Sequence, residues 1–473
     1  MDLKNPGAWL AESRQDRRIS DIQIEMSTRC KRTFVVFAVI LATSVFVPAQ
    51  SLDTKAADNG TDARSAREVF EDANGYLGRR YQEFNKKNQP YDPKLEAQVK
   101  KEQHDLALKN AAILETRKLH GDDRYFLGLL YHLAGDGDNA LKTMTQFVKE
   151  QPDSEKAQTA RNVVVLYSVK KDKVADALAA VDDYAKHQPQ SSEDRYRMEF
   201  LITDFFLRAK DFSQMATHSE QMMRAAKKFA TEHKSEVAKR DDMFLKSAMM
   251  LSDAYDKTDR KELAISMWQD LRRTSMQLPS GTLYKMATFR LATLSPNTDL
   301  RKISEEVATE TVAPPPELSG NQWIDQEPVK LSKLHGQVVL LDFWAPWCGP
   351  CRFTFPRLSL WHQAYKDKGL VILGVTKLYG HDDERNLTPG EELTYLRQFK
   401  KQNRLPYGFI VDDSNTNDFN YGVFSIPMSF LIDRRGAIRF ISVGAGESEI
   451  AELGKMIKKL IEEPAETKTE SSQ

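Results

Sequence analysis

The sequence has 473 residues, of which 41% are hydrophobic, so it is long enough for two or three domains with separate cores. Its 68 basic residues balance its 68 acidic residues, and no basic stripe with interleaved aromatic residues is present. This charge distribution gives no support to a nucleic-acid-binding protein, and we expect no nucleic acid among the partners.

The N-terminal segment, residues 1–49, has the pattern of a secretory signal peptide. Three basic residues precede an uncharged apolar run over residues 33–47, and the small residues that follow suit cleavage after Ala49. The run has about 15 residues, whereas a membrane-spanning helix needs about 20, so we favour a cleaved signal and keep an uncleaved N-terminal anchor as the alternative. A polar stretch precedes Met26, which indicates that the true start is Met26.

Cleavage after Ala49 removes Cys30 and leaves Cys348 and Cys351 as the only cysteines. Compartments outside the cytoplasm oxidise stray thiols, so a chain with a single close pair of cysteines suits a redox protein that works there. We therefore predict a secreted, extracytoplasmic protein of a bacterial periplasm, which an uncleaved segment would anchor to the inner membrane.

Residues 50–64 are small and polar, and we predict a flexible lead. Over residues 65–294, apolar residues recur three and four positions apart and Gly and Pro are sparse, which predicts helices. Polar clusters near residues 135, 171 and 209 interrupt these helices, so the pattern indicates a domain made of helical hairpins.

One of these hairpins resembles a tetratricopeptide repeat, although Arg124 and Met144 replace the Trp and Phe of that pattern. The resemblance implies degenerate repeats with a concave surface for a protein partner, and an ordinary helical bundle stays open as the alternative. We expect His187, His218 and His233 to be exposed, since they have no ligand spacing. The residues that carry the repeat pattern are Leu127, Gly128, Tyr131, Ala140 and Pro152, with Ala177 and Pro189 in a second unit.

Residues 295–317 end in three consecutive prolines, which favour an extended, proline-rich linker between two domains. Strand-like runs then alternate with helical patterns, so we predict an α/β domain over residues 318–462. The polar tail over residues 463–473 is expected to be disordered. The predicted elements of the α/β domain are strands at 338–341, 370–376 and 406–411, a hairpin of two strands around 434–436, and helices at 352–365, 391–403 and 447–461.

The chemistry lies where the first of these strands meets the first helix, in a turn that reads CGPC. A helix N-terminus stabilises an anion, so we expect the pKa of the Cys348 thiol to lie well below its usual value of about 8.5. Cys348 is therefore the predicted nucleophile, and Cys351, one helical turn later, is the predicted resolving thiol. Pro350 stiffens the turn because its φ is fixed, and Gly349 lets a partner backbone approach closely.

The segment from Asp342 to Cys351, which reads DFWAPWCGPC, resembles the active site of thioredoxin. Gly336 to Val339 before it, and Arg352 with Pro356 after it, look more like the secreted TlpA/ResA-type thiol–disulfide oxidoreductases, which carry an additional helix–strand unit. The similarity extends over the region from Pro314 to Glu462. The resemblance covers about a third of the chain, and it implies a thioredoxin fold with a central mixed sheet and a redox disulfide between Cys348 and Cys351. Half of a zinc site is the alternative interpretation of the two cysteines, but the second pair of ligands that zinc needs is missing.

Four further residues belong to the predicted site. Ile426 and Pro427 stand where thioredoxin-like proteins carry a cis-proline, which exposes the Ile426 backbone so that an extended substrate can pair with it. A trans proline at the start of an edge strand is the alternative.

Asp342 lies at the end of a buried strand, so its pKa should be raised, which fits a general base that takes the proton of the resolving thiol. A structural carboxylate that is only hydrogen-bonded is the alternative for Asp342. We expect Trp347 to shield the nucleophile and to form part of the docking surface, and a role in packing alone is the alternative.

These patterns predict an extracytoplasmic thiol–disulfide oxidoreductase that reduces disulfides in substrate proteins, without a cofactor or a metal. The family resemblance implies a membrane electron donor, and the helical region is expected to bind a protein partner. Two alternatives remain: an adaptor whose thioredoxin-like domain only docks, and an oxidase or isomerase with a different direction of electron flow. Peroxidase chemistry is disfavoured because Ala345 stands where a peroxiredoxin carries Thr.

Overall fold

The structure is a computed structural model that describes most of the chain. The predicted signal or anchor over residues 1–49 lies outside the described residues, as do most of the lead, most of the linker and the end of the tail. None of the described helices is both long and apolar enough to cross a membrane. The described stretches are residues 62–90, 92–297, 314–382 and 385–464.

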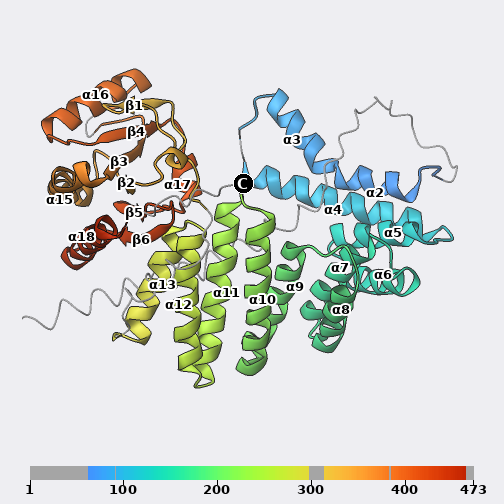
Figure 1. Cartoon of the computed structure of the whole chain (residues 1–473). Helices are drawn as coiled ribbons and strands as arrows, with labels where there is room; N and C mark the ends of the chain where they lie inside the picture. The colour runs from blue at the N-terminus through green and yellow to red at the C-terminus, as the bar shows by residue number, and fades with distance from the viewer. Residues whose placement is uncertain (1–61, 91, 298–313, 383–384, 465–473) are drawn as a thin grey trace, which may run out of the picture. The chain divides into compact units, whose positions relative to one another are not determined.

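The predicted helical region is confirmed (Figure 1). Its helices are α2 (Ala66–Asn74), α3 (Tyr76–Lys86), α4 (Pro93–Glu115), α5 (Asp122–Leu133), α6 (Gly137–Glu150), α7 (Ala157–Lys170), α8 (Val174–Lys186), α9 (Ser192–Ala209), α10 (Phe212–Glu232), α11 (Val237–Lys257), α12 (Lys261–Gln277) and α13 (Gly281–Leu294). Ser65 and Glu68 form a capping box at α2, and the Asp136 and Asp211 carboxylates accept hydrogen bonds from N–H groups in the first turns of α6 and α10. The predicted polar breaks separate α5 from α6, α7 from α8 and α9 from α10.

Neighbouring helices pack against each other in chain order: α5 against α6, α6 against α7, α7 against α8, and α9 against α10. Where α5 meets α6, a Cβ atom on Gly128 would lie 2.8 Å from the sulfur of Met144, so a side chain there would displace the methionine. Ala140 at the same contact is fully buried. Small residues at this crossing agree with the repeat pattern, and the repeat assignment itself stays a prediction.

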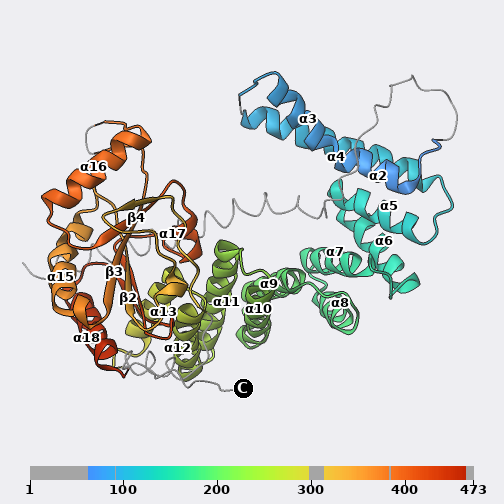
Figure 2. The ribbon, with the colours of Figure 1, turned by 45° about the horizontal axis from the view of Figure 1, so that its top comes forward.

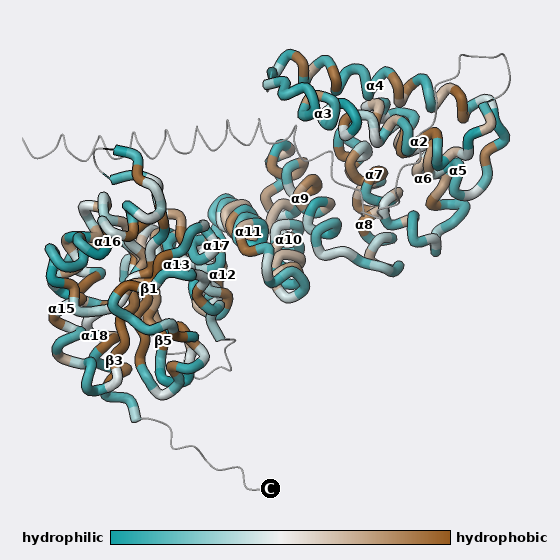
Figure 3. The backbone as a smooth tube through the Cα atoms, turned by 90° about the horizontal axis from the view of Figure 1, so that it is seen from above, coloured by the Kyte–Doolittle hydropathy of each residue, from teal (hydrophilic) through white to brown (hydrophobic). Residues whose placement is uncertain are grey.

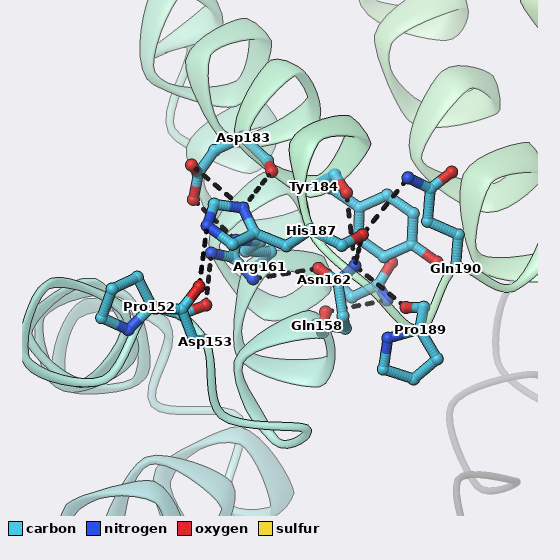
Figure 4. Close-up of polar contacts among 10 residues, drawn as sticks. All are labelled: Pro152, Asp153, Gln158, Arg161, Asn162, Asp183, Tyr184, His187, Pro189 and Gln190. Atoms are coloured by element: carbon cyan, nitrogen blue, oxygen red, sulfur yellow. Dashed lines mark hydrogen bonds and ion pairs between the residues drawn. The ribbon is translucent and has the colours of Figure 1, made fainter.

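Gln158 of α7 joins two neighbouring hairpins (Figure 4). Its side-chain amide nitrogen donates hydrogen bonds to the main-chain carbonyls of Tyr184, His187 and Pro189, at 3.2, 2.8 and 2.9 Å. These carbonyls lie at and beyond the C-terminal end of α8, where helix carbonyls lack partners within the helix. One buried glutamine therefore binds that end of α8 to α7.

Arg161, one turn further along α7, is buried and makes the second part of this joint (Figure 4). Its guanidinium donates hydrogen bonds to the Asp183 carboxylate at 2.6 Å, to the Gln158 side-chain oxygen at 3.0 Å and to the Pro152 carbonyl at 2.8 Å. Pro152 follows α6 and Asp183 belongs to α8, so Arg161 connects both helices to α7. Burial of the cation is tolerated because a carboxylate and two further oxygens surround it.

The expectation that the three histidines of this region are exposed is wrong for two of them. A ring nitrogen of His187 lies 2.8 Å from the Asp183 carbonyl, and only 22% of its side chain is exposed. Nδ1 of His218 lies 2.6 Å from a carboxylate oxygen of the buried Glu199, and the His218 ring stacks on Phe206. His218 of α10 contacts α9, and the other ring nitrogen of His187 lies 3.6 Å from the Asp153 carboxylate between α6 and α7, contacts that the polarity of a single helix does not reveal.

Within the described residues, the C-terminal domain contains a six-stranded mixed sheet in the order β1-β4-β3-β2-β5-β6. The strands are β1 (Gln322–Ile324), β2 (Val338–Phe343), β3 (Leu370–Lys377), β4 (Gly408–Asp412), β5 (Met428–Ile432) and β6 (Ile438–Val443), and the helices are α15 (Gly349–Tyr365), α16 (Pro389–Gln402), α17 (Thr416–Asn420) and α18 (Glu447–Glu462). β2, β3 and β4 are parallel, and the other pairs are antiparallel. The predicted strands, hairpin and three helices are confirmed, whereas β1 and α17 were not predicted because each is too short to show a period.

The side chains of β2 alternate between two hydrophobic layers. Val338 and Leu340 pack in the layer that contains α15 and α18, whereas Val339 and Leu341 pack in the opposite layer. Figure 2 shows α15 and α18 on one side of the sheet and α12 and α13 on the other. Both layers require apolar side chains, and β3 and β5 are accordingly largely hydrophobic in Figure 3.

The second layer includes helices from the helical region, which the sequence did not predict. Met276 of α12 and Tyr284 of α13 belong to the same buried cluster as Leu341 and Phe430 of the sheet. The Tyr284 ring also lies 6.3 Å from the ring of Phe440, in an edge-to-face arrangement. α12 and α13 are therefore part of the layer that covers the sheet.

The described end of the predicted linker also contacts the sheet domain. The Glu317 carboxylate accepts hydrogen bonds from the N–H groups of Leu331 at 2.6 Å and Ser332 at 3.0 Å. The Tyr421 hydroxyl donates a hydrogen bond of 2.6 Å to the Pro316 carbonyl. Residues 314–317 are thus held against this domain, and the domain boundaries stay predictions.

Replacing Arg161 with methionine tests the joint at α7. We expect Arg161→Met to lower the free energy of unfolding by about 1–3 kcal/mol, because the partly exposed Asp183 carboxylate, the buried Gln158 oxygen and the Pro152 carbonyl lose their donor. Chemical denaturation measures this loss. Arg208→Met is the matched control: Arg208 pairs with Asp204 on the surface with 56% of its side chain exposed, and its loss should change stability by less than about 1 kcal/mol. Equal losses in the two variants would contradict the role of Arg161.

Candidate active site

Cys348 occupies the junction between strand β2 and helix α15. β2 ends at Phe343, and the N–H of Cys348 donates a hydrogen bond of 3.1 Å to the Ala345 carbonyl, which closes the turn. Cys348 is the N-cap residue of α15, and its sulfur accepts a hydrogen bond of 3.2 Å from the N–H of Cys351. A sulfur in this position faces the unpaired N–H groups of the helix, which is the environment that stabilises a thiolate.

The sulfur atoms of Cys348 and Cys351 form a disulfide bond. Cys348 retains 4% of its surface and Cys351 retains none, so an incoming thiol or thiolate reaches Cys348 first. The rim of the pair is open: Trp347, Gly349 and Pro350 are exposed, and a Cβ atom on Gly349 would meet nothing within 4 Å. The arrangement thus places Cys348, which keeps a small exposed area, beside the fully buried Cys351.

Two contacts hold the rim in place. The Arg352 side chain donates a hydrogen bond of 2.7 Å to the Pro346 carbonyl in the turn before the cysteines, and its guanidinium also lies over the ring of Phe399. The Trp347 ring packs edge-to-face against Tyr379, with 44% of the tryptophan exposed. Trp347 therefore presents an apolar surface next to Cys348.

The Ile426–Pro427 peptide bond is cis and lies next to the end of β2. Strand β5 begins at Met428, which pairs with Phe343, so Pro427 stands opposite the start of the turn that leads to the cysteines. The Pro427 carbonyl accepts a hydrogen bond of 2.9 Å from the N–H of Gly444. In the part of the chain that the structure describes, the main chain of Ile426 forms no hydrogen bond, and it is available to a partner strand.

Asp342 is buried on the sheet face that carries α15. It lies on the same face of β2 as Val338 and Leu340, because every second residue of a strand points to the same side. Val338 and Leu340 pack in the same layer as Cys351. The Ser429 hydroxyl donates a hydrogen bond of 2.8 Å to one carboxyl oxygen, and the other oxygen has no partner among the described residues. Burial raises the pKa of Asp342 to about 7, and the Ser429 hydrogen bond opposes part of that rise. The carboxyl group can therefore exchange a proton near neutral pH.

Sequence reasoning missed two neighbours of Asp342. Ser429 faces it across the β2–β5 pair, and Tyr407 precedes β4. Burial, and then the nearby Asp342 carboxyl, raise the pKa of Tyr407 well above its usual range. The register of β5 on β2 could have revealed Ser429, whereas the contact with Tyr407 depends on the tertiary fold.

Asp342→Asn tests the electrostatics of this carboxyl group. The pKa of an aspartate in an unfolded chain is about 3.9. The folded protein holds this proton more tightly than the unfolded chain does. As the pH rises from about 4 to about 7, ionisation of this carboxyl group therefore lowers the free energy of unfolding of the wild type. The stability of Asp342→Asn relative to the wild type should therefore increase by about 2–4 kcal/mol between pH 4.5 and pH 8, measured by chemical denaturation of the oxidised proteins.

Asp412 provides the control for this measurement. Its buried carboxylate accepts hydrogen bonds from Ser414 and Asn417 at the end of β4. Asp412→Asn weakens these bonds, so it should destabilise the protein at pH 8 at least as much as at pH 4.5. A relative stability of Asp342→Asn that does not change with pH would contradict the raised pKa of Asp342.

Comparison with known proteins finds similarity in this C-terminal part. Residues 310–441 match the model of the AhpC/TSA family. Over 162 residues the chain is 32% identical to protein DipZ of Mycobacterium tuberculosis, which covers 33% of this chain and 22% of DipZ. Over 137 residues it is 28% identical to thiol-disulfide oxidoreductase ResA of Bacillus cereus, which covers 29% of this chain and 71% of ResA.

Among solved structures, a protein of Chlorobium tepidum assigned as thiol:disulfide interchange protein DsbE shares 30% sequence identity. The match covers 31% of this chain and 95% of that chain, with a TM-score of 0.27. The chain thus spans most of ResA and about a fifth of the length of DipZ. The C-terminal part of this chain is a thioredoxin-like domain, similar to the thiol-disulfide oxidoreductase ResA.

Proposed function

We propose that the protein is an extracytoplasmic thiol–disulfide oxidoreductase that reduces disulfides in substrate proteins. The observation that carries the proposal is the asymmetry of the Cys348–Cys351 pair: the outer sulfur caps a helix and can be reached, whereas the inner sulfur is buried. Similarity to ResA supports the same chemistry. The Cys-Gly-Pro-Cys turn and the Ile426–Pro427 pair resemble thioredoxin and favour the direction of a reductase.

The proposed reaction starts from the reduced protein. The Cys348 thiolate attacks one sulfur of a substrate disulfide, so that a mixed disulfide forms and the first substrate thiolate leaves. Asp342 accepts the proton of the Cys351 thiol, and the resulting thiolate attacks the Cys348 sulfur. This second step closes the Cys348–Cys351 disulfide and releases the other substrate thiolate. Two electrons pass to the substrate, and we propose that a membrane dithiol donor reduces the pair again.

We propose that the substrate docks on the exposed residues around the cysteine pair and on the main chain of Ile426. An extended polypeptide can add to this position as an extra strand, with its disulfide over Cys348. Trp347 and Pro427 would line the two sides of that segment, while Gly349 and Pro350 leave room for it. This mode of binding favours disulfides in peptide chains over small disulfides.

The proposal also includes the location of the protein and a role for the helical region. The basic and apolar pattern of residues 1–49 supports export, and the lone pair of cysteines in the exported chain suits an oxidising compartment. The serial packing of α5 to α8 and the close contact at Gly128 support tetratricopeptide-like repeats that bind a protein partner.

Trapping of the mixed disulfide tests the reaction. Reduced Cys351→Ser protein, mixed with a disulfide-bonded test protein such as insulin, should accumulate a covalent adduct through Cys348, because the second step lacks its thiol. Non-reducing electrophoresis and mass spectrometry measure the adduct, and dithiothreitol should cleave it by reducing the mixed disulfide. Cys348→Ser is the matched control and should give no adduct. Equal adduct from both variants, or none from either, would contradict the proposed roles.

A further inference from the structure

The first turn of α13, in the helical region, binds the segment that leads to Ile426 and Pro427. The N–H of Gly281 donates a hydrogen bond of 2.9 Å to the Tyr421 carbonyl, and the N–H of Thr282 donates one of 3.0 Å to the Gly422 carbonyl. The Thr282 hydroxyl donates a further bond of 2.8 Å to the same Gly422 carbonyl. The first N–H groups of a helix have no partner within it, and here two of them are used by residues about 140 positions later.

Buried polar groups of α11 and α13 surround the same point. Ser280 is the N-cap residue of α13, and its hydroxyl donates a hydrogen bond of 2.5 Å to the Asp241 carboxylate. Asp241 pairs with Arg240, and both side chains are buried. Gly422 has a φ of +56°, and a Cβ atom there would lie 2.8 Å from the Asp241 carboxylate and 2.9 Å from the Ser280 hydroxyl. Only glycine suits this position, because it tolerates the backbone conformation and the close approach.

The segment is therefore fixed at both ends. At its start, residues 421 and 422 are bound by α13, and at its end Met428 pairs with Phe343 in the sheet. A Cβ atom on Gly281 would overlap the sulfur of Met428, so the start of α13 also touches the first residue of β5. The Lys285 ammonium donates a hydrogen bond of 3.2 Å to the Ser425 hydroxyl, immediately before Ile426.

We infer that α13 positions the substrate-docking segment, with Thr282 as a positioning residue that acts through Gly422 on the main chain of Ile426. The inference rests on the proposed function, in which a peptide substrate pairs with Ile426. The helical region then takes part in the reaction with disulfides of polypeptides, which need that strand position. Small disulfides, which reach Cys348 without a strand, do not depend on it.

The test compares two substrates of the full-length protein: insulin, a polypeptide disulfide, and DTNB, a small aromatic disulfide. The protein is reduced beforehand and freed of dithiothreitol, because dithiothreitol itself reduces DTNB, and the second-order rate constant of the reduced protein with each disulfide is measured. Thr282→Val removes the hydroxyl group and keeps the size of the side chain. We expect the second-order rate constant for insulin to fall roughly two- to tenfold, the change that corresponds to one lost hydrogen bond, and the rate constant for DTNB to stay unchanged. Thr282→Ser retains the hydroxyl group and should restore the rate with insulin.

Thr293→Val is the matched control on the same helix. The Thr293 hydroxyl is exposed and, among the described residues, donates only to the Phe289 carbonyl within α13, so its loss should affect neither substrate. An equal fall for both substrates in Thr282→Val, or no fall in either, would overturn the positioning role. A wild-type protein that reduces neither substrate would instead overturn the proposed function itself, so the two failures can be told apart.

Discussion

The structure depends on the position of strand β2 between two hydrophobic layers. β2 pairs with β3 on one side and with β5 on the other, and its side chains alternate between the layer of α15 and α18 and the layer that includes α12 and α13. Both faces of this strand are therefore shielded from water, which explains its continuous run of apolar residues. The end of the same strand leads directly into the turn that carries Cys348.

Burial of β2 also sets the electrostatics of the candidate site. Asp342 is the one ionisable residue of this strand, and the apolar layer around it favours the protonated carboxyl group. A carboxyl group with a pKa near 7 can take a proton from a buried thiol, which an exposed carboxylate with a pKa near 4 does poorly. Cys348 caps the N-terminus of α15, an environment that favours a thiolate once the disulfide is reduced. The proposed roles of Cys348 as nucleophile and of Asp342 as proton acceptor depend on these two environments.

The redox pair was predictable from the sequence because its signal is local. A strand pattern, a CGPC turn and a helix pattern follow one another within 30 residues or so, and they place Cys348 at a helix N-terminus. The contact of α13 with the segment before Pro427 could not be predicted. It joins residues about 140 positions apart, and it uses main-chain groups of Tyr421 and Gly422 that carry no sequence pattern. The same reason applies to Tyr407 beside Asp342.

The most direct test of the proposed function is the reduction potential of the Cys348–Cys351 pair in the full-length protein, equilibrated in thiol buffers and measured by labelling of free cysteines. A reductase of protein disulfides predicts a value near about −270 mV, as in thioredoxin. A value near about −120 mV, as in strong oxidants, would contradict the direction of electron flow and would identify the pair as an oxidant of thiols.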